Sequence, residues 1–132
     1  MRYLSVEEIL AIHDESIEKD GGAFGVREMG FLHSLVERPK MAVFGQEFYP
    51  DMLTKAAATL EAMATYHVFA DGNKRTAFMA TATFLELNGF MMEVPSHAAL
   101  RFILAVATKK KSIPQIASWL KRYTKKKRRP SR

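Results

Sequence analysis

The stretch HVFADGNKRTAF, residues 67–78, interrupts a run of small apolar residues that is otherwise typical of helix. It places a histidine, an aspartate, a glycine and two adjacent cations within nine residues. On either side lie two helix-forming segments, 52–67 and 75–89, that are rich in alanine and other small residues. Because small residues let helices approach closely, we expect these segments to form the centre of an all-α bundle.

Four further helices are expected around this pair, giving a compact bundle of about six. The first begins at Ser5, and Glu8 three residues later completes the pattern of a capping box. The glycines of DGGAFG (20–25) must end this helix, since three glycines in five residues oppose helical structure. Periodic apolar positions predict the others at 27–37, 96–109 and 113–124.

The segment RPKMAVFGQEFYP (38–50) is an apolar, aromatic connection with a proline near each end. Its composition is compatible with a loop or with a hairpin. One interpretation is that it covers the core with its large apolar side chains, which are Met41, Val43, Phe44 and Phe48. Asp51, directly after it, is expected to cap the helix at 52–67.

Composition indicates one domain over residues 1–124 and restricts its setting. The chain of 132 residues is long enough to bury a core, and it contains no cysteine, which excludes disulfides and thiolate metal sites. The opening MRYLSVEEIL lacks the apolar stretch of a signal peptide, and no apolar run approaches the roughly 18 residues of a membrane helix. We therefore expect a cytoplasmic protein without a membrane partner.

Positive charge is concentrated at one end of the chain. The net charge is +6, yet residues 1–108 hold nine Lys and Arg against all 14 Asp and Glu, and residues 109–132 hold 11 Lys and Arg. We expect residues 125–132 to be a disordered, solvated basic tail. The alternative is that this tail contacts nucleic acid or an acidic partner; direct nucleic-acid binding by the rest of the chain is not expected.

The motif places an anion site at the start of a helix. Gly72 permits a tight turn, and the helix that begins at Asn73 presents free backbone N–H groups and the positive end of its dipole. Lys74 and Arg75 add two cations in the first turn, where they oppose the dipole. A bound polyphosphate would explain them, and a solvated surface pair is the alternative.

Three other residues of the motif carry complementary chemistry. Asp71 could hold Mg²⁺, which proteins bind through one or two carboxylates plus substrate phosphates. His67 is suited to accept a proton near neutral pH, and Phe69 could anchor the loop in the core. These residues predict phosphoryl or nucleotidyl transfer. The structural alternatives are that Asp71 is only an N-cap and that His67 only caps the preceding helix.

The string HVFADGNKRTA (67–77) resembles the signature of the Fic/Doc family, His-x-Phe-x-Asp/Glu-Gly/Ala-Asn-x-Arg. The resemblance extends over about residues 2–122. Further stretches are similar, in the same order, to the death-on-curing (Doc) branch: GGAFGVRE (21–28), LVERP (35–39), FGQEFYP (44–50), KAAATLEAMATYH (55–67) and FLELNGF (84–90).

The resemblance implies a role for each residue of the motif. His67 would be the general base on a target hydroxyl, Phe69 the loop anchor and Asp71 the Mg²⁺ ligand. ATP phosphates would be bound by the helix start, which comprises Gly72, Asn73, Lys74 and Arg75. It also implies a helical Fic/Doc fold, in which 38–50 could be a flap that holds an extended target segment.

Two positions separate the Doc branch from AMP-transferring Fic enzymes. Those enzymes usually carry a second glycine where this chain has Lys74, and an arginine where it has Phe78. The resemblance therefore implies a kinase-like toxin that phosphorylates a translation factor similar to elongation factor Tu and is paired with a small antitoxin. An AMP transferase on the same fold is the alternative, and a non-catalytic partner-binding or co-repressor module is a third.

Overall fold

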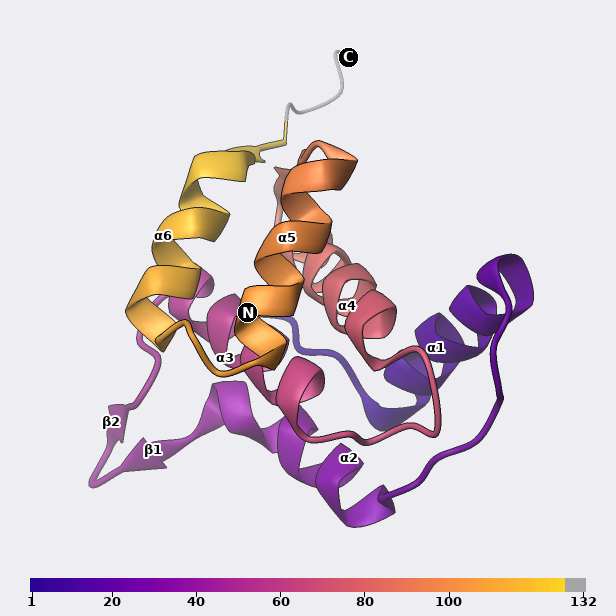
Figure 1. Cartoon of the computed structure of the whole chain (residues 1–132). Helices are drawn as coiled ribbons and strands as arrows, with labels where there is room; N and C mark the ends of the chain where they lie inside the picture. Colours follow the sequence, from indigo (N-terminus) through magenta and orange to yellow (C-terminus); the bar gives the residue numbers. More distant parts are fainter. Residues whose placement is uncertain (128–132) are drawn as a thin grey trace, which may run out of the picture.

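The computed structural model describes residues 1–127, which form six α-helices, one 3-10 turn and two small antiparallel sheets (Figure 1). The helices are α1 (Val6–Asp20), α2 (Met29–Glu37), α3 (Met52–Thr65), α4 (Asn73–Leu87), α5 (Ser96–Ala107) and α6 (Ile113–Tyr123). The expectation of an all-α bundle of about six helices is confirmed. Among residues 1–127, no helix combines the length and the apolar character needed to cross a bilayer.

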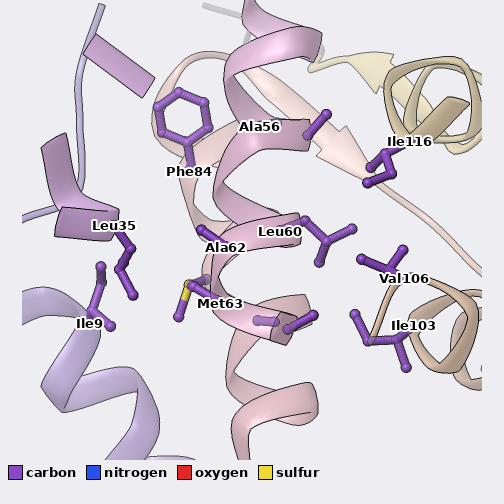
Figure 2. Close-up of a cluster of buried hydrophobic side chains, with 14 of the residues drawn as sticks. Ile9, Leu35, Ala56, Leu60, Ala62, Met63, Phe84, Ile103, Val106 and Ile116 are labelled. Atoms are coloured by element: carbon purple, nitrogen blue, oxygen red, sulfur yellow. The ribbon is translucent and has the colours of Figure 1, made fainter. Parts of the chain in front are cut away.

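Helix α3 forms the centre of the bundle. Nine of its 14 residues are buried, so it is covered on all sides rather than on one stripe. Figure 2 shows Ile9 and Leu35 reaching it from α1 and α2, while side chains of α5 and α6 reach it from the opposite side. The small residues predicted to allow close approach are completely buried where α3 meets its neighbours, as Ala56 and Ala62 illustrate.

Helix ends are set by the caps that the sequence predicts. The Ser5 hydroxyl accepts from the Glu8 N–H at 3.1 Å, and the Glu8 carboxylate accepts from the Ser5 N–H at 3.0 Å. Asp51 begins α3 in the same way, since its carboxylate accepts from the Thr54 N–H at 2.8 Å. Helix α4 ends at Leu87, followed by the predicted stop, where Gly89 has a φ of 90°.

The segment 38–50 is a short 3-10 turn, η1 (Arg38–Lys40), followed by a hairpin of β1 (Ala42–Val43) and β2 (Gln46–Glu47). Its two-residue turn has positive φ at both Phe44 and Gly45, the backbone of a type I′ turn. The interpretation that this segment covers the core is wrong, because its large apolar side chains are exposed and that of Phe44 completely so. The hairpin projects from the bundle (Figure 1).

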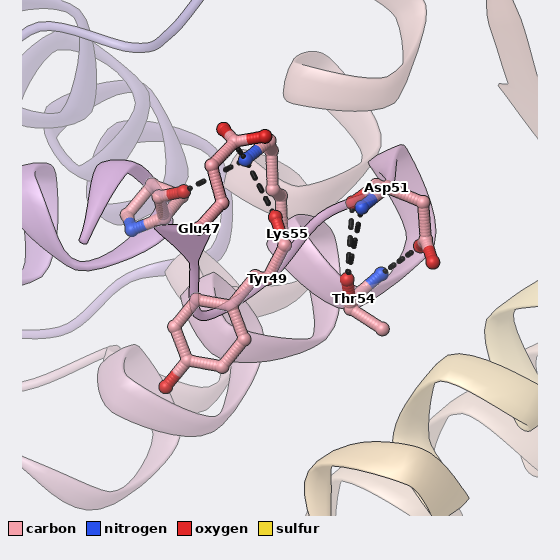
Figure 3. A network of polar contacts seen from close by, with 6 residues as sticks. Glu47, Tyr49, Asp51, Thr54 and Lys55 are labelled. Carbon is pink, nitrogen blue, oxygen red and sulfur yellow. Dashed lines mark hydrogen bonds and ion pairs between the residues drawn. The ribbon is translucent and has the colours of Figure 1, made fainter. Parts of the chain in front are cut away.

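A buried lysine fastens this hairpin to α3. The ammonium group of Lys55 donates to the carbonyls of Tyr49 at 2.6 Å and Pro39 at 3.2 Å, and to the Glu47 carboxylate at 2.7 Å (Figure 3). Its side chain is only 3% exposed, and burying a charge is costly unless it is hydrogen-bonded. The cost is offset here because all three N–H groups of the ammonium have acceptors. The network joins both ends of the hairpin to the central helix.

A second sheet, absent from the sequence prediction, pairs β3 (Phe90–Met92) with β4 (Thr124–Lys126). The Lys127 N–H also donates to the Gly89 carbonyl at 2.8 Å. The expectation of a disordered tail from residue 125 is therefore wrong for 125–127, where ladder hydrogen bonds order a segment whose lysines are poor strand formers. The remainder of the predicted tail, 128–132, lies outside the described residues.

Candidate active site

The loop 66–72 turns sharply at its start. The backbone of His67 has a φ of 52°, a left-handed conformation that is uncommon outside glycine and is often associated with functional sites. This turn sends Val68 and Phe69 into the core, where each is at most 2% exposed, and leaves His67 exposed. The prediction that Phe69 anchors the loop is confirmed. The alternative that His67 caps α3 is wrong, because the C-cap is Tyr66.

A neighbouring backbone segment supports this loop. The N–H groups of Arg27 and Glu28 both donate to the Val68 carbonyl, at 2.8 and 3.0 Å, and the Ala70 N–H donates to the Gly25 carbonyl at 3.1 Å. These bonds leave the loop few unsatisfied polar groups as it enters the core. They explain why the glycine-rich stretch after α1 lies against the motif.

Asn73 closes the loop at its other end. Its amide group accepts from the Phe69 N–H and donates to the Phe69 carbonyl, both at 2.9 Å. The side chain is therefore used inside the protein, and only its backbone N–H faces the helix start. The structure thus gives the Asn73 side chain a positioning role that its sequence motif did not reveal.

His13 is a component of the site that the sequence prediction missed. Its ring stacks on that of Phe69, with centroids 3.8 Å apart and planes 7° from parallel. Its Nε2 donates to the Asp71 carbonyl at 2.7 Å. The sequence does contain a sign that His13 is buried. It lies between Ile9 and Ile17 at four-residue spacing, on the buried stripe of α1.

Asp71 is exposed and ionised. Its carboxylate accepts from the Ala23 N–H at 3.2 Å and from the Gly72 N–H at 2.8 Å, and these two hydrogen bonds lower its pKa. It does not cap α4, whose N-cap is Gly72, so the interpretation of Asp71 as only an N-cap is wrong. Gly22 packs against it, since a Cβ there would lie 2.6 Å from Asp71 Oδ2.

The start of α4 carries unsatisfied donors. Gly72 has a φ of 76°, as the predicted tight turn requires, and no side chain caps the helix. Within residues 1–127, the N–H groups of Asn73, Lys74 and Arg75 have no acceptor. Helices α1, α3 and α6 have capping boxes, whereas α4, like α2 and α5, has no side-chain cap and leaves its first turn open to an anion.

The two cations of the motif differ in their surroundings. Lys74 is exposed, whereas Arg75 is half-buried and donates to the carbonyls of Gly21 at 2.8 Å and Asp20 at 3.5 Å. Arg75 therefore stabilises the negative end of α1, and the alternative of a simple solvated pair is wrong for it. Its Nε atom is buried without a hydrogen-bond partner among the described residues.

Phe78 belongs to an aromatic cluster instead of a phosphate clamp. It meets Trp119 of α6 edge to face at 6.3 Å, and Trp119 stacks on Phe102 at 4.0 Å. The aromatic side chain at this position is thus used in packing α4 against α6. It offers no charge to the helix start.

Loop 66–72 and the first turn of α4 therefore carry the predicted base, carboxylate and anion-binding backbone on nine consecutive residues, 67–75. Within residues 1–127 no group of three or more His, Asp or Glu could hold a metal ion by itself. This arrangement fits a cation such as Mg²⁺ that is bound by one carboxylate and completed by substrate phosphates and water. Asp71, ionised and exposed, is the residue of the loop that fits such an ion.

Comparison with known proteins places these features in one family. The family model described as Fic/DOC family matches residues 3–85. The chain is 41% identical to "Toxin Doc" of Mycolicibacterium smegmatis over 90 residues, which are 68% of this chain and 67% of that protein. It is 34% identical to "Protein kinase doc" of Escherichia phage P1 over 123 residues, which are 92% and 95% of the two chains. The chain therefore belongs to the Fic/DOC family, in its Doc toxin branch.

Proposed function

We propose that this protein is the toxin of a toxin–antitoxin pair and transfers the γ-phosphate of ATP to a hydroxyl group of a protein. The observation that carries the proposal is the uncapped start of α4. Three free N–H groups there lie next to an ionised carboxylate, Asp71, and an exposed cation, Lys74. Such a site binds phosphates through hydrogen bonds and the helix dipole.

His67 is the proposed general base. It is exposed at the entrance of the loop, and its side chain has no hydrogen-bond partner within residues 1–127, so a substrate hydroxyl can reach it. Deprotonating that hydroxyl as it attacks phosphorus is general-base catalysis. The left-handed backbone of His67, held by the buried residues that follow it, fixes the direction in which the imidazole is presented.

The helix start is the proposed phosphate site. Backbone N–H groups of Gly72, Asn73, Lys74 and Arg75 line it, although that of Gly72 is used by Asp71 in this structure. Asp71 would hold Mg²⁺, which neutralises phosphate charge when bound. The Arg75 guanidinium would bind phosphate with the N–H groups that its two carbonyl partners leave free.

Two residues favour transfer of the terminal phosphate over transfer of AMP. Lys74 lies beside the free N–H groups of the helix start. A glycine at this position would leave room there for the α-phosphate, and the lysine side chain fills that room. Its ammonium instead provides a charge that can stabilise a moving phosphoryl group. Phe78 packs on Trp119, so the second arginine clamp of an AMP transferase is replaced by an aromatic contact. AMP transfer on the same fold remains the second candidate.

The protein partners follow from the Doc branch. Both relatives carry Doc names, one as a toxin and one as a protein kinase, which supports a toxin that is restrained by a small cognate antitoxin. The proposed substrate is a translation elongation factor of the Tu type in the cytoplasm, whose phosphorylation would stop protein synthesis. The exposed hairpin 42–47 is the proposed flap against which an extended substrate segment lies.

Mass spectrometry tests this function directly. Elongation factor Tu incubated with the protein, ATP and Mg²⁺ should gain the mass of one phosphate. His67→Ala should lower the rate by about 10²- to 10⁴-fold, the usual contribution of a general base. His97→Ala, which removes an exposed histidine on α5, is the matched control and should keep the wild-type rate. An unmodified factor, or full toxicity of His67→Ala in cells, would favour the non-catalytic module.

A further inference from the structure

A cavity of about 470 Å³ opens beside loop 66–72, and none of its lining residues has a role in the proposed phosphate transfer. It lies between the C-terminal end of α3 and the connection from α5 to α6. Each of its six lining residues carries a polar or charged group: Arg38, Glu61, Thr65, Tyr66, Lys109 and Lys111. Tyr66, which lines the cavity, directly precedes His67, the proposed base, in the chain.

The single carboxylate in the lining is already neutralised. Glu61 accepts from Arg38 Nη1 at 3.0 Å, and the same nitrogen donates to the Tyr66 hydroxyl at 2.9 Å. Arg38 Nε donates to the Tyr49 hydroxyl at 3.3 Å, which leaves Nη2 without a partner among the described residues. Because the Tyr66 oxygen accepts, its own proton is free to donate.

Two of the remaining lining residues, Lys109 and Lys111, are cations without acidic partners among the described residues. Neither Lys109 nor Lys111 forms an ion pair with any residue in the described range 1–127. Lys111 is half-buried, and Lys109 is held with a φ of 62°, an uncommon backbone for lysine. The cavity therefore offers two ammonium groups, a guanidinium edge and a phenol proton, and its one carboxylate is paired with Arg38. A ligand that fits this set is an anion with several acceptor oxygens.

We infer that this cavity recognises the carboxylate of an aspartate or glutamate in the protein substrate, close to the hydroxyl that accepts phosphate. This inference rests on the proposed function, because it places a substrate hydroxyl at His67. An extended chain advances about 3.3 Å per residue, so the acidic side chain would lie one to three residues from the modified serine or threonine. The nucleotide is the other source of an anion, but its proposed site is the α4 start, at the far end of loop 66–72.

Peptide libraries test the cavity. We would measure binding, without nucleotide, of fluorescent peptides that carry one central threonine and either Asp, Asn or Lys at each flanking position. The wild type should bind the best Asp peptide about tenfold more tightly than its Asn counterpart, and added salt should reduce the difference. Lys109→Ala/Lys111→Ala should abolish the preference, and Lys109→Glu/Lys111→Glu should invert it toward Lys peptides.

Lys110 supplies the matched control, since it lies between the two lysines without lining the cavity. Lys110→Ala should keep the wild-type preference. A parallel transfer assay separates the two proposals: acidic preference in binding without phosphate transfer would refute the kinase and leave the cavity assignment standing. Equal binding of Asp and Asn peptides by the wild type would overturn the inference. The inference would also be overturned if Lys109→Ala/Lys111→Ala raised the KM for ATP and left the preference for Asp peptides unchanged.

Discussion

The amide side chain of Asn73 pairs with both backbone polar groups of Phe69, at 2.9 Å each. This relationship closes loop 66–72 into a rigid turn, because Phe69 is itself buried at 2% exposure. His67 and Asp71 lie on either side of the buried residue. The Asn73 side chain therefore helps to fix their relative position, together with the bonds from Arg27, Glu28 and His13 to the loop.

Replacing Asn73 should loosen the loop more than it destabilises the protein. Asn73→Ala removes two hydrogen bonds, which corresponds to about 1–3 kcal/mol of unfolding free energy. Hydrogen exchange of the Phe69 amide should accelerate strongly, and phosphate transfer should fall while the thermal transition stays cooperative. Asn88→Ala, which removes an amide side chain at the end of α4, is a control that should leave exchange at Phe69 unchanged.

His13 should contribute through both its ring and its N–H group. His13→Phe keeps a ring beside Phe69 but leaves the Asp71 carbonyl without its donor, which should cost about 1–3 kcal/mol. His13→Ala also loses the stacked contact and opens a cavity, so it should be clearly less stable than His13→Phe. Urea denaturation of both variants measures the difference. Equal stability of the two would show that the stack with Phe69 contributes little.

Lys55 should determine how firmly the hairpin is held. Lys55→Met preserves much of the side-chain volume but strands the buried carbonyl of Pro39 and that of Tyr49, at a cost of about 1–3 kcal/mol. Glu47→Gln should cost less, because Glu47 is 48% exposed and water can replace its bond to Lys55. In hydrogen exchange, the Phe48 amide, which bonds to Met41, should lose protection in Lys55→Met. Unchanged protection would contradict the role of Lys55 as an anchor.

The carboxylate of Asp71 should make the difference in stability between the wild type and Asp71→Ala depend on pH. Hydrogen bonds from the N–H groups of Ala23 and Gly72 lower the pKa of its carboxyl in the folded protein. The stability that the ionised Asp71 carboxylate contributes is therefore present above the ordinary pKa of an aspartate. It is lost as the pH falls through the lowered pKa of Asp71 in the folded protein. The gap in unfolding free energy between wild type and Asp71→Ala should be constant near neutral pH and shrink as the pH falls below the ordinary pKa of an aspartate and through the lowered pKa of Asp71. A gap that widens in acid would contradict this hydrogen-bond assignment.

Much of the fold could be predicted from the sequence because its signals are local. Capping residues such as Ser5 and Asp51, and the glycines after α1 and α4, marked helix ends that the structure confirms. The strand β4 could not be found this way, since TKK has weak strand propensity and its partner lies more than 30 residues earlier. The hairpin was recognised as a possibility, but the exposure of Phe44 depends on where the bundle ends.

The site shows the same division between local and distant information. The motif placed His67, Asp71 and the α4 start on one loop, and the structure agrees. The contacts of His13 and of Arg75 with residues more than 50 positions away depend on how α1 packs, which no motif spacing encodes. The roles of the site residues in phosphate transfer stay predictions.

Labelled ATP tests the central claim that this fold acts as a kinase. With elongation factor Tu as substrate, label from γ-³²P-ATP should appear on the factor and label from α-³²P-ATP should not. Lys74→Gly should lower γ-label transfer, because the ammonium beside the α4 start would no longer stabilise the moving phosphoryl group. Transfer of the α-label by the wild type would contradict the kinase assignment and identify an AMP transferase with the same His67 and Asp71.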